Sequence, residues 1–525
     1  MLNEQAVSEL EGLVGPALLC TDPEEVRRKT GNTLGLERRV LGIIYPETEE
    51  QVQAIVQAAN RHRLALYPYS TARNIGYGER LPVTEGNLLV DLGRMNEIVH
   101  LDPDLGYADV QPGVTQGQLC DYVREQGIPF FVDATGSSRD SSIVGNSAEG
   151  GFGTTPRGNK RKEITCVRGV YGSGERFDTG FFPGSVGPDL AGMFVQSSFG
   201  IITQLRIPLN PVTEDYRSLM INVHEESDFL GLVEALRELR QRGTLTNQVV
   251  ITNALDALGA SRVEIPDAYK GKPISNAVAN EIMSSPLGSF GACSAIGAVY
   301  GSRAEVRARC RTVRRAVRER LGKRAKVRFM TTRSLNFLTT LLSTWPFSKL
   351  AVTAKLGAPL RSFREAHGMM QGVASDDALI GLLGEVKDTY EDARLMWYSS
   401  RVSTRSADVS RFVAIASSCY ERHGFEYPLE MLMVTPNDLI AIQKVDWESA
   451  DPEQGERAWK LYEFLGRELR QAGYPPYRLG VQSQEDVLYP EERRRTLETL
   501  KRTFDPNGVI APGRYGISLS MKSPG

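Results

Sequence analysis

The sequence predicts an α+β protein with two domains, and three observations lead to this fold class. Residues 40–215 are rich in glycine and alternate helical patterns with short extended runs. Residues 216–475 contain long amphipathic helices with strands between them, and the chain from about 476 is rich in turn-forming residues. Such alternation is typical of α+β domains. We predict a first domain at 1–215, a second at 216–475, and a segment at 476–525 that returns to the first domain.

Two capped helices and several strands are expected in the first domain. Thr48 and Gln51 have the spacing of a capping box, so a helix is expected to begin there. A second capped helix is expected to begin at Thr115 and to end near Gly127, which is suited to the position after a helix. Extended runs that predict strands lie at 64–69, 87–93, 97–101 and 107–111.

In the second domain, hydrophobic periodicity predicts helices at 229–242, 303–320, 407–422 and 456–472, with strands such as 249–253 and 429–434 between them. The pattern indicates a sheet covered by helices. The helix at 303–320 is rich in arginine and carries Val306, Cys310, Val313 and Val317 on one side. A solvated basic face is the preferred interpretation, and a nucleic-acid patch is the alternative.

Composition excludes several classes of protein. The chain has 525 residues, 41% hydrophobic and 24% charged, with a net charge of −2, which excludes disorder and gives no basic field for nucleic acid. No apolar run approaches the ~18 residues of a membrane span. Six scattered cysteines and five histidines lack the spacing of disulfide frameworks or metal sites. No positive region precedes an early apolar run, so a cytoplasmic location is expected, with export alongside a partner left open.

Two glycine-rich loops are candidates for binding a cofactor. The first, at 70–78, follows a strand, and its small residues allow backbone N–H groups to form an anion-binding nest beside Arg73. The second, at 141–155, contains Gly145, Gly150 and Gly153, which permit close backbone approach to a flat ligand. Each loop alone is more often a surface connection, but two in one domain favour a nucleotide cofactor. No GxGxxG occurs, so a Rossmann site has no support.

Five segments resemble the flavoproteins of the vanillyl-alcohol oxidase and p-cresol methylhydroxylase family: 73–78 (RNIGYG), 110–114 (VQPGV), 144–147 (VGNS), 194–203 (FVQSSFGIIT) and 505–513 (DPNGVIAPG). The likeness covers roughly residues 40–516 in the right order. It implies a family-type FAD-binding domain and an α+β cap domain whose antiparallel sheet is covered by helices. The FAD-binding residues that it implies are Ser70, Thr71, Ala72, Arg73, Asn74, Ile75, Ser142, Ile143, Gly145, Asn146, Gly150, Gly153, Thr154, Gly200, Ile201, Ile202 and Arg514.

The resemblance also implies a substrate, a para-alkylphenol held as phenolate by two tyrosines and an arginine. Tyr77, Tyr477 and Arg478 match those positions, although Tyr477 and Arg478 alone resemble a surface pair after a Pro-Pro turn. Lowering a phenol pKa of about 10 by about 3 costs roughly 4 kcal/mol. Charge-assisted hydrogen bonds of ~1.5–3 kcal/mol each can supply that. Hydride then leaves the benzylic carbon for the flavin, and water adds to the p-quinone methide.

Two positions bear on the branch of the family. Alcohol oxidases place an aspartate beside the flavin, where this chain has Ser137, with Asp133 and Asp140 near. Methylhydroxylases place a glutamate on a cap strand, which corresponds to Glu430 in the apolar run 427–434. Glu430 is either an edge residue facing solvent or a general base with a raised pKa. Ser137 with Glu430 favours the methylhydroxylase arrangement, in which Glu430 activates the attacking water.

The attachment of the flavin is left open by the sequence. None of the five histidines lies just before the strand at 395–398, so a histidyl link is disfavoured. The methylhydroxylases use a tyrosine preceded by a glutamate, and Tyr390 and Glu385 lie at about those places. FAD is therefore expected either to be linked through Tyr390 or to be bound without a covalent bond.

The combined expectation is an FAD enzyme that oxidises and hydrates the benzylic position of a 4-alkylphenol. The methylhydroxylase likeness implies that a c-type cytochrome accepts the electrons, and that a homodimer of the flavoprotein binds one cytochrome on each subunit. The alternative is an oxidase that passes electrons to O₂ and releases H₂O₂. A third interpretation, a binding module that has lost activity, is disfavoured by the retained Tyr77, Tyr477 and Arg478.

Overall fold

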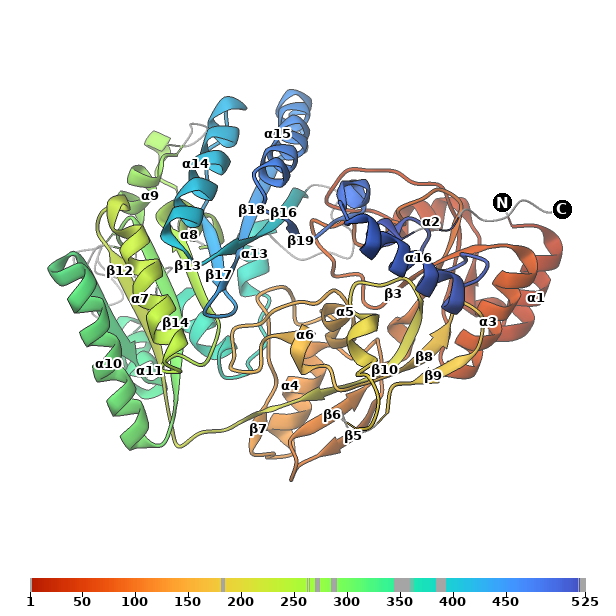
Figure 1. The fold of residues 1–525 in the computed structure, drawn as a ribbon, viewed down its shortest axis with the longest axis horizontal. Coiled ribbons are helices and arrows are strands. Elements are labelled where there is room, and N and C mark those ends of the chain that lie inside the picture. The colour runs from red at the N-terminus through yellow and green to blue at the C-terminus, as the bar shows by residue number, and fades with distance from the viewer. Residues whose placement is uncertain are drawn as a thin grey trace.

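The fold is described from a computed structural model of the chain (Figure 1). It describes residues 2–180, 185–343 apart from 262, 264, 270–273 and 285–289, 360–383 apart from 361, 393–517, and 519. Elements of the first domain lie on one side of the molecule, and a large sheet with its covering helices lies on the other (Figure 1).

The described part of the first domain contains two main sheets, of four and five strands, and a short antiparallel pair formed by β7 (Phe130–Phe131) and β11 (Asn210–Pro211). The smaller has the strand order β1 (Leu19–Cys20), β2 (Val40–Ile44), β4 (Asn87–Asp91), β3 (Ala65–Tyr69), in which β2, β4 and β3 run parallel. The larger is antiparallel, with the order β5 (Ile98–Asp102), β6 (Tyr107–Val110), β10 (Gly200–Pro208), β8 (Cys166–Tyr171), β9 (Arg176–Asp178). The helices of this domain include α1 (Glu4–Val14), α2 (Pro23–Lys29), α3 (Glu49–His62), α4 (Gln116–Glu125) and α5 (Ile143–Ala148).

Both predicted helix starts in this domain are confirmed. The side chains of Thr48 and Thr115 accept hydrogen bonds from the backbone N–H three residues later, as N-caps do. The reciprocal half of the box at Thr48 does not form, because Gln51 Oε1 instead accepts a hydrogen bond from Glu47 N at 2.7 Å. Gly127 has φ +62° and follows α4, as its position predicted.

The C-terminal segment lies beside β3. Helix α16 (Glu491–Phe504) leads into it, and Leu66 exchanges backbone hydrogen bonds of 2.7 Å with Val509 and Ala511. A fully buried ion pair of 2.7 Å joins Lys501 to Asp505, whose carboxylate also accepts from the N–H groups of the following turn. These contacts fix residues 505–511 beside β3, the strand that leads into the glycine-rich loop 70–78.

The second domain is built on an eight-stranded antiparallel sheet, which confirms the predicted fold class. Its strand order is β15 (Ala325–Met330), β12 (Asp215–Val223), β14 (Cys293–Gly301), β13 (Val249–Asn253), β17 (Glu430–Met433), β18 (Asp438–Glu448), β16 (Ala393–Ser403), β19 (Pro476–Arg478). The strand β19, from the segment that returns to the first domain, forms one edge.

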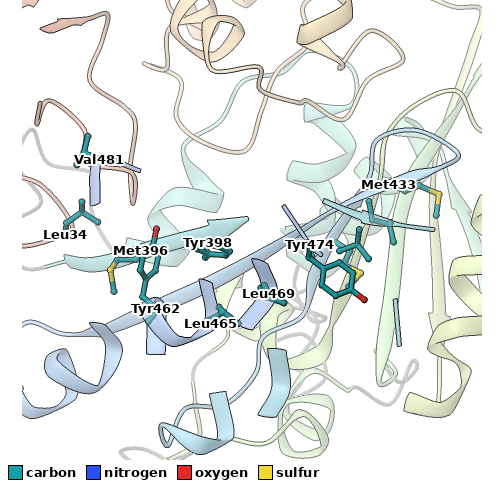
Figure 2. Packing of buried hydrophobic residues seen from close by; sticks show 14 of the residues in the cluster. Leu34, Met396, Tyr398, Met433, Tyr462, Leu465, Leu469, Tyr474 and Val481 are labelled. Atoms are coloured by element: carbon teal, nitrogen blue, oxygen red, sulfur yellow. The ribbon is translucent and has the colours of Figure 1, made fainter. Parts of the chain in front are cut away.

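Four long helices cover one face of this sheet: α7 (Phe229–Gln241), α10 (Arg303–Leu321), α14 (Ser406–Arg422) and α15 (Pro452–Gln471) (Figure 1). Figure 2 shows Leu465 and Leu469 of α15 below Tyr398 of β16, with Tyr462 of α15 beside Met396 of the same strand. On α10, the valines predicted to lie on one side are buried, and most of the arginines are exposed. Because side chains alternate along a strand, the opposite face of the sheet is left for the first domain and the site.

Truncating the core beneath α15 should destabilise the fold. Leu465 is fully buried in the cluster between α15 and the sheet. We expect Leu465→Ala to lower the free energy of unfolding by about 2–5 kcal/mol, because it removes apolar contacts and leaves a cavity. Urea unfolding followed by circular dichroism measures this change. Glu463→Ala, at an exposed position of the same helix, is the control and should change stability by less than about 0.5 kcal/mol.

Candidate active site

A cavity of about 880 Å³ lies between the glycine-rich loops of the first domain and the uncovered face of the eight-stranded sheet. One end is lined by residues drawn from the segments 67–77, 135–149, 197–202 and 510–515. The other end is lined by side chains of β12, β13, β14, β15, β17 and β18 and by residues of the segment 360–379. The cavity is large enough for a cofactor at one end and a further ligand at the other.

The two glycine-rich loops meet at the first end of this cavity. Ser142 N donates to Thr71 Oγ1 at 3.0 Å, and Ser142 Oγ caps α5 by accepting from Gly145 N at 2.8 Å. Gly145 has no room for a side chain, since an added Cβ would lie 2.4 Å from Ser70 Oγ. The backbone of the second loop therefore packs directly against the Ser70 and Thr71 side chains of the first, and the two loops together form a cradle at this end of the cavity.

Buried polar atoms in this cradle support the presence of a ligand. Asn146 Oδ1 and Thr154 Oγ1 are buried, line the cavity and have no hydrogen-bond partner within the described residues. Unpaired buried polar atoms are costly in a folded protein. A cofactor with many hydrogen-bonding groups, such as FAD, fits the donors and acceptors that these loops present.

Most of the residues predicted to bind the cofactor line the cavity. They are Ser70, Thr71, Ala72, Arg73, Asn74, Ile75, Ser142, Gly145, Asn146, Gly153, Thr154, Gly200, Ile201, Ile202 and Arg514. Two predicted residues do not line it. Ile143 is buried in the hydrophobic core beneath α5, and Gly150 turns its carbonyl towards Tyr477. Arg73 forms an ion pair with Asp140 at 3.0 Å.

Crowding at Gly145 gives a prediction about cofactor retention. We expect Gly145→Ala to lower the ratio of bound flavin to protein, because the new methyl group would collide with Ser70 Oγ. The absorbance of purified protein near the flavin maximum measures that ratio. The double variant Gly145→Ala/Ser70→Gly removes the colliding atom and should recover retention. Equal loss in the single and double variants would show that the collision is not the cause.

Arg478, on β19 of the eight-stranded sheet, contacts residues of both glycine-rich loops. Its guanidinium lies over the ring of Tyr77, with Cζ 4.5 Å from the ring centroid, and Nη2 donates to Asn74 Oδ1. Nε lies 3.3 Å from Glu149 Oε2 in an ion pair without a hydrogen bond. Burial lowers the pKa of Arg478, but the Glu149 carboxylate and the surrounding tyrosines together raise it by more, so the guanidinium stays charged inside the protein.

Tyr77 is placed to donate a hydrogen bond into the cavity. Its side chain is 9% exposed, and its hydroxyl lies 3.0 Å from Ser399 Oγ on β16. Burial raises the pKa of Tyr77, so the phenol is protonated at neutral pH. When Ser399 donates to Tyr77, the Tyr77 proton is free for a ligand oxygen beside Arg478.

Tyr477 is placed differently from its expected role. Its hydroxyl donates to the Gly150 carbonyl at 2.9 Å, its ring packs on Phe152, and it is not among the residues that line the cavity. A tyrosine hydroxyl has one proton to donate, and here that proton is used. Arg478 and Tyr77 therefore meet at the cavity, whereas Tyr477 supports the loop beside them.

Glu149 is a central residue to which the sequence assigned no role. It accepts hydrogen bonds from Arg514 and from the Tyr515 hydroxyl, and it lies beside Arg478. Burial raises the pKa of Glu149, but the guanidinium groups of Arg514 and Arg478 lower it by more, so the carboxylate is ionised. Its position as the single acidic residue inside the glycine-rich loop 141–155 was the only signal in the sequence.

Glu430 begins β17 and lines the cavity, so it does not lie on a solvent edge. Its pKa is raised to about 8, chiefly by burial and also by the neighbouring Asp256, while Lys444 acts in the opposite direction. Asp256 accepts from Thr252 Oγ1 at 2.7 Å, and Thr252 is the cross-strand partner of Glu430. Both carboxyl groups and the Lys444 ammonium therefore share one polar patch of the cavity wall.

Ser137 also lines the cavity, in a chain of hydroxyl groups with Thr135 and Ser141 at 2.8 Å each. The neighbouring aspartates are engaged elsewhere: Asp133 pairs with Lys160 at 2.6 Å, and Asp140 is exposed beside Arg73. Neither aspartate lines the cavity.

Glu385 and Tyr390, the candidates near the flavin attachment, lie outside the described residues. The proposed covalent link therefore stays a prediction.

Comparison with known proteins agrees with this geometry. Residues 40–180 match the family model described as "FAD binding domain". The flavoprotein subunit of 4-cresol dehydrogenase (hydroxylating) from Pseudomonas putida is 29% identical over 490 residues, which cover 90% of this chain and 87% of that protein. A crystal structure of p-cresol methylhydroxylase with substrate bound superposes with a TM-score of 0.83 at 28% identity, covering 98% of this chain and 96% of that one.

This chain is an FAD flavoprotein related to 4-cresol dehydrogenase. The resemblance seen in its five segments is thereby confirmed, and so are the fold class and the cofactor. The flavoprotein is also similar to 1'-carboxy-chondrochloren decarboxylase from Chondromyces crocatus, at 26% identity over 537 residues, covering 98% of this chain and 97% of that protein. Relatives of similar identity thus include proteins named for different reactions. Among the helices of the described residues, none has the length and apolar character to cross a membrane.

Proposed function

We propose that this flavoprotein oxidises the benzylic carbon of a para-substituted phenol and adds water to the product. The observation that carries the proposal is the buried Arg478 guanidinium, which lies at the cavity against Tyr77, on the same sheet face as Glu430.

The sheet sets the distance between these groups. Arg478 pairs with Ser399, Ser399 with Ile442, and Ile442 with Glu430, so they form one row across four neighbouring strands. Three strand spacings of about 4.8 Å separate the backbones of Arg478 and Glu430 by roughly 14 Å. With both side chains directed into the cavity, an aromatic ring fits between a guanidinium at its oxygen and a carboxyl group at its para substituent.

Arg478 and Tyr77 are proposed to hold the substrate oxygen as phenolate. The charged guanidinium stabilises the anion, and Tyr77 donates a second hydrogen bond while it accepts from Ser399. FAD, when bound, supplies the acceptor for the hydride, two electrons with a proton, that leaves the benzylic carbon. The substrate becomes a p-quinone methide, and Glu430 takes a proton from the water that attacks it.

The electron acceptor is proposed to be a c-type cytochrome, with the flavoprotein as one subunit of the assembly. The relative from P. putida is named as a flavoprotein subunit, which supports a partner protein. Reoxidation by O₂ with release of H₂O₂ is the alternative. Attachment of FAD through Tyr390 belongs to the same proposal.

Lys444 favours a second candidate, oxidative decarboxylation. Its ammonium lines the cavity near Glu430, where it can neutralise a carboxylate on the substrate side chain. A carboxylate on the carbon next to the benzylic carbon leaves as CO₂ from the quinone methide, and its bonding electrons form the vinyl double bond and restore the phenolate. The similarity to a decarboxylase over nearly the whole chain supports this candidate.

Anaerobic mixing with para-alkylphenols tests the proposal. Bleaching of the flavin absorbance by 4-ethylphenol, with formation of 1-(4-hydroxyphenyl)ethanol, is the expected result. Bleaching only by substrates with a side-chain carboxylate, together with release of CO₂, would replace hydration by decarboxylation. Failure of every para-alkylphenol to bleach the flavin would overturn both. Rapid H₂O₂ release in air would favour the oxidase over the cytochrome-coupled enzyme.

A further inference from the structure

The cavity extends well beyond the groups that the proposed reaction needs. From Glu430, the row continues through Thr252 and Ser294 to Asn222 on β12. The adjacent row on the same face runs through Leu432, Val250, Ile296 and Met220 to Arg328 on β15, again by direct cross-strand pairing. All five members of this second row line the cavity.

The floor of this extension is apolar along most of its length. A continuous hydrophobic track along the sheet is formed by Leu432, Val250, Ile296 and Met220. The segment 360–379 adds Phe363, Met369 and Met370 to the cavity lining. Methionine side chains are flexible and adapt to ligands of irregular shape. A track of this kind accepts an extended hydrocarbon chain, and a methyl or ethyl group alone would leave it empty.

Arg328 ends the track. Its Nη1 donates to Asn222 Oδ1 at 2.6 Å, and Asn222 is itself fixed by donating to Ser294 Oγ at 2.8 Å and to Phe290 O at 2.7 Å. No carboxylate forms an ion pair with Arg328 among the described residues, and burial lowers its pKa. A half-buried guanidinium is thus held by a neutral amide, with its other donors left for a ligand.

We propose that this extension binds the para substituent of the substrate, and that the substituent is a long apolar chain ending in a carboxylate or similar anion held by Arg328. This inference rests on the proposed function, because it assumes that the phenol lies at Arg478. Placing an anion at Arg328 pairs a half-buried cation for which the described residues supply no carboxylate, while the chain covers the apolar track.

The register gives the length of that chain. Four strand spacings of about 4.8 Å separate β17 from β15, which is roughly 19 Å between Glu430 and the backbone of Arg328. The Arg328 side chain reaches back over part of this distance. At about 1.5 Å per carbon–carbon bond, the substituent needs roughly ten bonds between the benzylic carbon and the anion.

A series of ω-(4-hydroxyphenyl)alkanoic acids, compared with their methyl esters, tests the inference. We expect kcat/KM to favour the acid over the ester roughly tenfold to a hundredfold at the matching chain length, and not for short chains, because only the long acid reaches the guanidinium. Arg328→Met should abolish this preference and Arg328→Lys should restore part of it. Arg318→Met, at an exposed position of α10, is the matched control and should keep the wild-type preference.

Two further measurements separate this inference from the proposed function. Flavin bleaching by 4-ethylphenol, which is too short to reach Arg328, tests the reaction alone. Equilibrium dialysis with long ω-phenylalkanoates, which lack the phenol hydroxyl and are not oxidised, tests the Arg328 site alone. Equal dissociation constants for these acids and their esters in the wild type, or an acid preference that survives in Arg328→Met, would overturn the inference.

Discussion

Replacing Arg478 by methionine should slow flavin reduction by a para-alkylphenol by roughly a hundredfold, since charge-assisted hydrogen bonds contribute about 1.5–3 kcal/mol each. The guanidinium is the cation placed to stabilise a phenolate beside Tyr77, and methionine keeps much of its volume without its charge. Glu149 keeps Arg514 as its partner in the variant, so the carboxylate is not left unpaired. Anaerobic stopped-flow absorbance measures the rate of reduction.

The dependence on substrate acidity distinguishes lost phenolate stabilisation from general damage. In Arg478→Met, ring-fluorinated phenols with a lower pKa should recover part of the lost rate, because they ionise without the guanidinium. Arg411→Met, at an exposed position of α14, is the control and should reduce its flavin at the wild-type rate. A uniform loss for all phenols, regardless of their pKa, would contradict the assigned role of Arg478.

Replacing Glu430 by glutamine should slow formation of the alcohol by about a hundredfold, the usual contribution of a general base. Flavin reduction precedes the attack of water and should change much less. With 4-ethylphenol, the quinone methide that is not hydrated should lose a proton and appear as 4-vinylphenol. Chromatography of the products therefore reports the role of Glu430 separately from binding.

The pH dependence of alcohol formation tests the role of Glu430 in a second way. Its pKa is raised to about 8, so below that pH it carries a proton and cannot accept one from water. We expect alcohol formation in the wild type to increase as the pH rises through about 8 and then to level, and Glu430→Gln to lack this increase. The raised pKa also means that the contribution of Glu430 to stability is present below about 4.5 and is lost as the pH rises through 8. If Glu430→Gln gave the same ratio of alcohol to 4-vinylphenol as the wild type, Glu430 would be excluded as the base.

Local patterns in the sequence predicted the elements well. The strand at 249–253 has the same bounds in the structure, and α7 and α10 end within one residue of the prediction. Helix α15 begins four residues earlier than predicted, at Pro452, because Asp451 caps it and proline is suited to a first helical turn. That signal is in the sequence, but it precedes the amphipathic pattern from which the helix was predicted.

The site was predicted only as far as motifs carry information. The loops 70–78 and 141–155 and the residues Tyr77, Arg478 and Glu430 all reach the cavity. The orientation of the Tyr477 hydroxyl depends on a carbonyl more than 300 positions away, and no local pattern encodes it. Arg328 joins the site through cross-strand pairing over five strands, which a single sequence does not reveal.

Asn74 links the cofactor end of the cavity to the substrate end. The backbone around it lines the part of the cavity predicted to bind FAD, while its side chain accepts a hydrogen bond from the Arg478 guanidinium, which we propose binds the substrate oxygen. Binding of a ligand at the cofactor end of the cavity therefore restricts Asn74, and with it the position of Arg478 at the substrate end. Binding free energies are coupled reciprocally. If bound FAD increases the affinity for the phenol by some factor, the bound phenol must increase the affinity for FAD by the same factor.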